Sequence, residues 1–457
     1  MNSAFKDINE LHTLSKMKII DNVTCLIYNQ NELQIINTTF KNIVMPHKIK
    51  IYENNNYKQI SPSSIICNLN NARLNISNSS FDTIDAKLIA NDGEVNIENS
   101  NFTTVNSQTP CIEIILGSDN EITLENTQIT SYKFNWDNES GTGPIYSTNQ
   151  LIINNCNFID FAINPQYFVT RAYGAFEYLL NNNWYTIYIK RESDANTDLY
   201  GGVVYNTGNL IINESYFKNT QASTAGAIYN TGNTTITKTN TYNIISNSNS
   251  GCAGIIYNTG FVNISDSFFN KSAAQELGGA IRNLGKLTIT NTTIYDTNAN
   301  RQFGSSLRGG AISNAGELNI SNSAIIKSEA LGRGGAIHNT GNMIINTTII
   351  EKSSSSLGII HNDEDAYANI YNSMFIDNRL DGFNTNPEIV TYGIILNQGN
   401  MVFDRNIIDF RRYNPGGSSG TYGIYNSGNI IITHNLFINT TTYKVDRWGN
   451  PLSNIRI

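Results

Sequence analysis

The segment GGAIHNTGNMIINTTII, residues 334–350, contains the pattern that decides the fold. It combines a Gly-Gly-Ala-Ile start, an Asn-x-Gly group and alternating apolar residues. The same pattern returns at residues 278–294 and at residues 309–325. Self-similarity of this length is typical of solenoids, in which each repeat contacts only its neighbours. The fold therefore has to be understood coil by coil.

An apolar skeleton extends the repeat along most of the chain. In each coil two apolar residues are separated by one residue, and a third lies seven residues after the first. The first positions are Leu33, Leu74, Val95, Ile122, Leu151, Leu210, Thr234, Val262, Leu287, Leu318, Met343, Ala368, Met401 and Ile430. Alternation with a period of two predicts β-strands and excludes a helical repeat.

The spacing of these first positions predicts how the strands are arranged. Most successive positions are 21 to 33 residues apart, which suits one turn of a three-sided coil. Crossovers between parallel strands are almost always right-handed. We therefore predict an all-β, right-handed parallel β-helix of about 14 coils over residues 22–440. Residues 1–21 and 441–457 are expected to be terminal segments.

Polar residues mark the turns between the predicted strands. Asn lies four residues before the first apolar position in most of the 14 coils, and Gly usually follows it by two. A general preference of Asn for turns explains the residue type but not its fixed register, so we predict an amide ladder along the axis. The glycine is expected to supply a positive φ. Pairs such as Asn322-Ser323 are expected to bend the chain into the next strand.

Composition limits the class of protein. The net charge of −7 over 457 residues argues against a nucleic-acid surface, which needs clustered Lys and Arg. The five cysteines are odd in number and share no repeat position, so we expect buried small hydrophobes rather than a disulfide framework. Neither a signal peptide nor a membrane span is apparent in the sequence, which leaves the route of export open.

The longest insertion, residues 159–200, is rich in aromatic and cationic side chains and has the pattern of a β-hairpin. Such side chains are frequent contacts for glycan or protein partners. The candidate contact residues are Tyr173, Tyr178, Trp184, Tyr185 and Tyr188. The alternative is a hairpin whose aromatic side chains pack over the flank of the β-helix.

A second candidate site lies where one turn is expanded. His361 follows His338 by one coil in the same column, and Asp363, Glu364 and Asp365 come after Asn362 in the same turn. Two imidazoles ~5 Å apart beside carboxylates are suitable metal ligands. The same column holds Tyr, Arg and Ser in other coils, as an exposed position would. We therefore expect a solvated outer face and no bound metal or other cofactor.

The phrases at residues 334–342 and 229–233 resemble the repeats of adhesin-like surface proteins of methanogenic archaea. They resemble more distantly the repeats of polymorphic outer-membrane proteins. The segment at residues 446–451 is similar to the Trp-Gly-Asn segment that often follows such repeats. The resemblance implies a pectate-lyase-like right-handed β-helix at the cell surface.

Two functional hypotheses follow. The first is a non-catalytic, extracellular binding rod whose partners are surface glycans or proteins of other cells. The alternative is a polysaccharide lyase or hydrolase, because the same architecture also hosts such enzymes. Acidic residues rarely share a column in adjacent coils, and no polygalacturonase-like signature occurs. We therefore predict no catalytic residues and prefer the binding rod.

Overall fold

The computed structural model describes most of the repeat region, and every structural statement below refers to this part of the chain. The described residues are 3–6, 25–44, 49–53, 56–60, 64–69, 71–85, 87–107, 112–114, 121–125, 127–130, 133–134, 141–142, 145–163, 175–180, 183–188, 199–246, 252–299, 307–380, 393–409, 422–438, 444–445 and 451–452.

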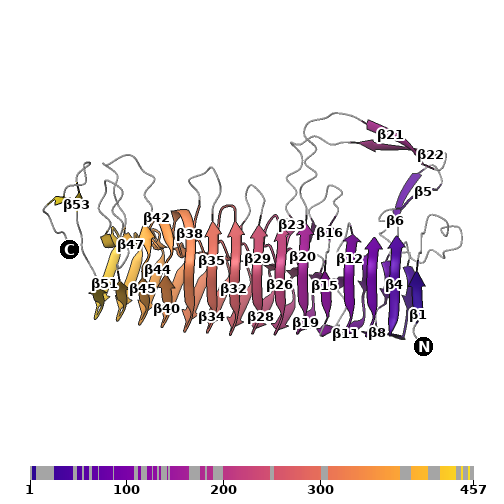
Figure 1. The fold of residues 1–457 in the computed structure, drawn as a ribbon, viewed down its shortest axis with the longest axis horizontal. Coiled ribbons are helices and arrows are strands. Elements are labelled where there is room, and N and C mark those ends of the chain that lie inside the picture. Colours follow the sequence, from indigo (N-terminus) through magenta and orange to yellow (C-terminus); the bar gives the residue numbers. More distant parts are fainter. Residues whose placement is uncertain are drawn as a thin grey trace.

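Three long parallel sheets run along the described chain, and Figure 1 shows them as a straight rod with the termini at opposite ends. We call them the Asn sheet, the Leu-Ile sheet and the Phe sheet after the residues that recur in them. The 14 strands of the Asn sheet are β2 (Cys25–Asn29), β7 (Ser64–Asn68), β10 (Lys87–Asn91), β13 (Ile112–Ile114), β18 (Ile145–Ser147), β24 (Val204–Asn206), β27 (Ile228–Asn230), β30 (Ile256–Asn258), β33 (Ile281–Asn283), β36 (Ile312–Asn314), β39 (Ile337–Asn339), β43 (Ile360–Asn362), β47 (Gly393–Asn397) and β50 (Tyr422–Asn426).

The Leu-Ile sheet follows the Asn sheet in every coil. Its 14 strands are β3 (Glu32–Ile36), β8 (Arg73–Ser77), β11 (Glu94–Glu98), β14 (Glu121–Glu125), β19 (Gln150–Asn154), β25 (Asn209–Asn213), β28 (Asn233–Thr237), β31 (Phe261–Ser265), β34 (Lys286–Thr290), β37 (Glu317–Ser321), β40 (Asn342–Asn346), β44 (Tyr367–Tyr371), β48 (Asn400–Asp404) and β51 (Asn429–Thr433).

The Phe sheet completes each coil. Its 18 strands are β1 (Ser3–Lys6), β4 (Thr38–Val44), β9 (Ser80–Asp85), β12 (Asn101–Ser107), β15 (Gln128–Thr130), β16 (Lys133–Phe134), β20 (Asn157–Ile163), β26 (Tyr216–Ala222), β29 (Asn240–Ser246), β32 (Phe268–Ala274), β35 (Thr293–Ala299), β38 (Ala324–Arg333), β41 (Ile349–Glu351), β42 (Ser354–Leu357), β45 (Met374–Ile376), β46 (Arg379–Leu380), β49 (Ile407–Asp409) and β52 (Leu436–Ile438).

The predicted parallel β-helix is confirmed, and so is its register. Leu287 pairs with Leu318, which pairs in turn with Met343, so the three residues share one column. All 14 predicted first positions lie in the Leu-Ile sheet. The fold is thus an all-β, right-handed parallel β-helix. No helix in the described residues is long and apolar enough to span a membrane.

The core is a set of apolar columns that run the length of the rod. Ile320, in the Leu-Ile sheet, is 2% exposed, and the phenyl rings of Phe40 and Phe81 stack at 4.5 Å between centroids. Thr241 interrupts the Phe-sheet column between Phe217 and Phe269, as the sequence indicates. A void too small for water lies beside it, because threonine is smaller than the residues that it replaces.

The predicted Asn ladder is confirmed. From Asn206 to Asn426, each amide Nδ2 donates to the Oδ1 of the Asn in the next coil, at 2.7 to 2.9 Å. The same Nδ2 atom also donates to the backbone oxygen of the turn glycine in most coils, for example Gly316. These side chains are almost all buried, so the ladder satisfies polar groups that would otherwise be costly inside the rod.

The expected role of the turn glycines is wrong. Gly232 and its equivalents do not have a positive φ. A Cβ at Gly232 would collide with the carbonyl oxygen of Gly208 in the coil before it, so close backbone approach requires the glycine. Positive φ occurs instead at the first glycine of the Gly-Gly pairs, such as Gly334 with φ of 68°.

The polar pairs between the Leu-Ile and Phe sheets form the predicted turns. Asn291 and Asn322 adopt the left-handed region, with φ of 50° and 49°. The second residue of each pair is buried and forms a hydroxyl ladder that the sequence analysis did not predict. Ser323, for example, accepts a hydrogen bond at its Oγ from the backbone N–H of Thr292 at 3.2 Å.

The expectation of unpaired cysteines is wrong at one place. Cys25 of β2 and Cys67 of β7 form a disulfide, with 5.9 Å between their Cα atoms. The two residues are 42 positions apart in the chain, but neighbouring strands bring them together. Cys156 is buried, as expected. Cys111 lies outside the described residues.

Short two-stranded sheets occur outside the three long ones. Within the predicted insertion, β21 (Ala175–Leu180) pairs antiparallel with β22 (Asn183–Tyr188), and Figure 1 shows this hairpin standing off the rod. The other pairs are β5 (Ile49–Glu53) with β6 (Asn56–Ile60), β17 (Gly141–Thr142) with β23 (Leu199–Tyr200), and β53 (Lys444–Val445) with β54 (Pro451–Leu452). The predicted domain limits, 22–440 and 159–200, stay predictions.

Candidate functional site

The outer column of the Asn sheet is the candidate site. It consists of the residues that lie between the inward apolar residue and the ladder Asn, and that point away from the core because side chains alternate along a strand. In the coils from β18 to β47 they are, in order along the rod, Tyr146, Tyr205, Tyr229, Tyr257, Arg282, Ser313, His338, His361 and Leu396. The column therefore changes from aromatic to cationic to imidazole within a few coils.

The first part of the outer column is a stack of tyrosine rings. The stack consists of three nearly parallel rings, Tyr205, Tyr229 and Tyr257, with 4.9 Å between successive ring centroids. The ring of Tyr146, one coil before Tyr205, lies 5.4 Å from the Tyr205 ring. Tyr200 meets Tyr229 edge-on. The rings thus face one another along the rod, and the side chains are half-buried. Burial raises the pKa values of Tyr205 and Tyr257, so these phenols remain protonated donors at neutral pH.

Two arginines continue the surface beyond the tyrosines. The Arg282 guanidinium donates to the Ser313 hydroxyl at 2.7 Å. Arg308 lies at a bridge beside β38, and its Nε is buried without a hydrogen-bond partner among the described residues. Burial lowers the pKa of Arg282, and the positive charge of Arg308 acts in the same direction. No described carboxylate forms an ion pair with either guanidinium.

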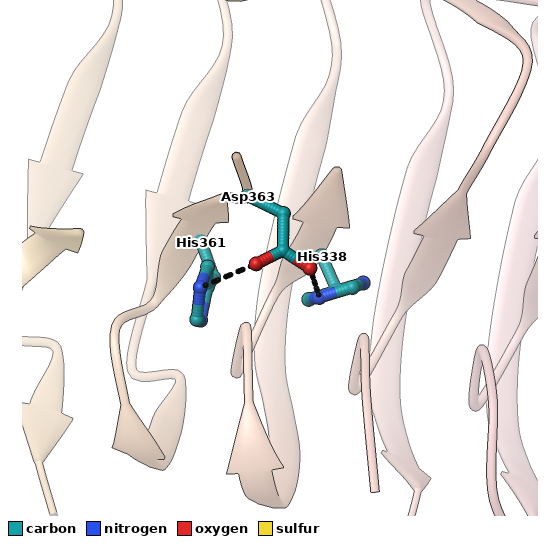
Figure 2. A group of neighbouring side chains, drawn as sticks. All are labelled: His338, His361 and Asp363. Carbon is teal, nitrogen blue, oxygen red and sulfur yellow. Dashed lines mark ion pairs between the residues drawn. The ribbon is translucent and has the colours of Figure 1, made fainter. Parts of the chain in front are cut away.

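The expanded turn after β43 places a carboxylate between two buried imidazoles, as Figure 2 shows. Asp363 has Oδ2 at 3.4 Å from His338 Nε2 and Oδ1 at 3.5 Å from His361 Nε2. The two rings are 5.2 Å apart between centroids, close to the spacing expected from the sequence. His361 Nε2 is also 2.8 Å from the Gln398 Oε1.

The expected solvated face is wrong at this end of the column. His338 and His361 are each 1% exposed, and Ser313 and Leu396 are buried too. The turn that replaces Asn-x-Gly folds Asp363 over both rings, and its backbone N–H donates to the Asn339 carbonyl at 2.9 Å. The sequence of one coil does not predict this burial of the two histidines, because it depends on the conformation of the turn.

Electrostatics sets the charge state of the cluster. Burial lowers the pKa of His338 to about 4, although Asp363 opposes the shift, so this imidazole is neutral at pH 7. The His338 and His361 rings hold the pKa of Asp363 well below its usual range. Arg333 Nη1 lies 3.4 Å from Asp363 Oδ1 and partly balances its charge. The cluster is thus a carboxylate beside the neutral His338 ring, the His361 ring and the Arg333 guanidinium.

The other predicted site residues are not brought together with this cluster. Asp365 and Glu364 are exposed at the tip of the same turn. Tyr178, Trp184, Tyr185 and Tyr188 lie on the two strands of the β21–β22 hairpin, whose side chains are outside the described set. Tyr173 lies outside the described residues. The sequence analysis missed Arg308, because it falls outside the repeated motif.

Comparison with known proteins gives distant structural neighbours only. No family model matches the chain, and no curated protein matches it. A solved alginate lyase, AlyF-OU02 with G6, aligns over 96% of this chain and 97% of its own, at 9% identity and a TM-score of 0.34. A family 28 exopolygalacturonase of Yersinia enterocolitica aligns over 84% of this chain and 74% of its own, at 11% identity and a TM-score of 0.26. Likenesses this distant carry no argument about activity.

Proposed function

We propose that this protein is a non-catalytic, adhesin-like protein of the cell surface that binds an acidic glycan along the outer column of the Asn sheet. The observation that carries the proposal is the pair of arginines, Arg282 and Arg308, at the end of the tyrosine stack. Both guanidinium groups are partly buried and lack a carboxylate partner among the described residues.

The charge of these arginines favours an anionic ligand. Removing a guanidinium from water without a counter-ion costs free energy, and a ligand carboxylate would recover it. Arginine presents its N–H groups in a planar fork that matches carboxylate geometry. Uronate and other acidic sugar units supply that group at regular intervals along a chain. A repeating polymer is thus suited to a surface that repeats every coil.

The tyrosine stack adds the second part of the recognition surface. Its half-buried tyrosines supply one phenol donor per coil, about 4.8 Å apart. Sugar hydroxyls are both donors and acceptors, so such a row suits a glycan that lies along the rod. Tyrosine also contributes large contact area with few rotatable bonds to immobilise.

Binding without cleavage is favoured over the enzymatic alternative by the chemistry of the cluster. A glycan hydrolase uses two carboxylates about 5–9 Å apart, whereas the cluster presents Asp363 alone between two rings. A lyase needs a base that reaches the sugar. His338 is 1% exposed beneath Asp363, which keeps substrate from its ring nitrogens.

The test compares glycans of matched size and different charge by isothermal titration calorimetry. Polygalacturonate and alginate are expected to bind, and neutral dextran is not. The double variant Arg282→Gln/Arg308→Gln should lose most of the affinity. Raising the salt concentration should weaken wild-type binding, because exposed ionic contacts are screened over ~10 Å at 0.1 M salt.

Lys286→Gln is the matched control. It removes one positive charge from the same coil as Arg282, but from the Leu-Ile sheet, where Lys286 pairs with Glu317 at 3.3 Å. Its affinity should equal that of the wild type. Equal binding of dextran and alginate would contradict the proposal. Release of unsaturated or reducing ends during the titration would favour the lyase or hydrolase alternative instead.

A further inference from the structure

The cluster of His338, His361 and Asp363 has a feature that glycan binding does not use. The Nε2 of His338 is buried and has no hydrogen-bond partner among the described residues, although the Asp363 Oδ2 lies 3.4 Å away. A buried polar atom left without a partner costs about 1–3 kcal/mol. Such an atom beside a second buried imidazole and a carboxylate calls for a physical explanation.

We propose that these three residues bind a divalent transition-metal ion of the zinc type, through the Nε2 atoms of both histidines and one carboxylate oxygen of Asp363. This site lies in the same outer column as Arg282, beyond Ser313, and its assignment does not depend on glycan binding. Two imidazoles and a carboxylate are donors that zinc and its neighbours prefer, whereas calcium and magnesium prefer oxygen ligands alone.

The distances agree with this assignment. Ligand atoms at ~2.0–2.2 Å from a tetrahedral zinc ion lie about 3.3–3.4 Å from one another. Asp363 presents a different oxygen to each ring: Oδ2 is 3.4 Å from His338 Nε2, and Oδ1 is 3.5 Å from His361 Nε2. Taken one from each residue, the ligand atoms lie within 4.8 Å of one another, so rotation of the rings and of the carboxylate must bring them closer around an ion.

The surroundings supply the rest of a coordination site. The Gln398 Oε1 is 2.8 Å from His361 Nε2 and is placed to act as a fourth ligand or to hold a water there. His338 and His361 are fixed on paired strands, and Asp363 is anchored through its backbone N–H to the Asn339 carbonyl.

Two described cations oppose a bound metal ion: Arg333, which contacts Asp363, and Arg308, whose charge acts on His338. The Arg333 guanidinium is 3.4 Å from the Asp363 carboxylate, and the side chain is 37% exposed. We infer that Arg333 holds the carboxylate in the metal-free protein and moves toward solvent when the ion binds. This competition distinguishes a metal site from a purely structural ion pair, because removing Arg333 should strengthen metal binding.

Cobalt binding tests the proposal, because tetrahedral Co²⁺ has visible absorption bands. The full chain, stripped with EDTA, should bind about one equivalent of Co²⁺ with a visible spectrum, and Zn²⁺ should displace it. His338→Gln and Asp363→Asn should abolish the spectrum. Arg333→Gln should bind Co²⁺ about tenfold more tightly, because it removes a repelling charge.

Two variants serve as matched controls, and thermal unfolding shows that each variant folds. Asp365→Asn removes the same charge from the exposed part of the same turn, and it should not change Co²⁺ binding. His434→Gln removes an exposed histidine that lies 2.9 Å from Asp404, and this variant should also bind Co²⁺ as the wild type does. The proposal is wrong if folded wild-type protein binds no Co²⁺, if the spectrum survives in Asp363→Asn, or if Arg333→Gln does not tighten binding.

Discussion

The inward and outward residues of the Asn sheet come from the same short strands, yet they vary in opposite ways. Inward, Ile256, Ile281, Ile312, Ile337 and Ile360 are identical through five coils, and the Asn ladder continues beside them. Outward, the same coils carry Tyr, Arg, Ser, His and His. Inside, each side chain must fit its copy above and below, whereas the outer column is under no such restriction. The constant inward columns thus stabilise the fold, whereas the variable outer column carries the residues that we propose bind ligands.

The largest expected effect is at an inward position. Ile320→Asp places a carboxylate in the apolar column of the Leu-Ile sheet, where no described cation is available to pair with it. We expect a loss of roughly 4–5 kcal/mol in the free energy of unfolding. Urea denaturation measures this loss. The control is Asn319→Asp, on the outward side of the same strand, whose free energy of unfolding should lie within ~0.5 kcal/mol of the wild-type value. If the Ile320→Asp variant had the same free energy of unfolding as the wild type, this column would not be the core.

The Asn ladder should respond next most strongly. Asn314→Ala removes the bonds that Asn314 exchanges with Asn283 and Asn339, both at 2.7 Å. A loss of about 2–4 kcal/mol follows, because buried partners are left unsatisfied. Asn426 lies at the exposed end of the ladder, so Asn426→Ala should cost less than ~1 kcal/mol. Equal losses of stability at both positions would show that the contribution of a ladder Asn does not depend on its burial.

In the outer column, the expected effect on stability depends on pH. The folded-state pKa of His338 is about 4, below the unfolded value, so the unfolded chain binds the extra proton first as the pH falls. Stability should therefore decrease between about pH 6.5 and pH 4, by up to roughly 3 kcal/mol from this group. His361, Asp363 and Arg308 face the same ring and contribute to its pKa.

This dependence is measured by urea unfolding in the presence of EDTA across that pH range. His338→Gln cannot titrate, so the difference between wild type and variant should shrink on acidification. The prediction is contradicted if the two proteins keep a constant difference, since His338 would then carry no linked proton.

The smallest expected effect is a gain in stability. Thr241 leaves a void between Phe217 and Phe269, and its buried hydroxyl has no hydrogen-bond partner among the described residues. Thr241→Ile should fill the gap and stabilise the chain by about 1 kcal/mol. Thr239→Ile should destabilise it, because the Thr239 hydroxyl donates to the Thr237 carbonyl at 3.0 Å. Thermal unfolding distinguishes the two.

The contrast between inward and outward residues also explains what could be predicted from the sequence. Columns such as Leu287, Leu318 and Met343 were predictable, because apolar spacing within one coil sets the register of all coils. Proximity of His338 and His361 followed from that register. Their burial did not, because it depends on how Asp363 folds over them and on Arg333 from another strand. The Cys25–Cys67 disulfide was missed for a similar reason, since those residues share no repeat position.

The central claim is that the outer column, and not the β21–β22 hairpin, is the main glycan contact. The deciding measurement is the affinity for alginate of two double variants, Arg282→Gln/Arg308→Gln and Trp184→Ala/Tyr188→Ala, in the same calorimetric assay. We predict that the arginine variant loses binding at an unchanged melting temperature and that the hairpin variant retains it. Lost binding in the hairpin variant, with full binding in the arginine variant, would contradict the account and move the contact to the insertion.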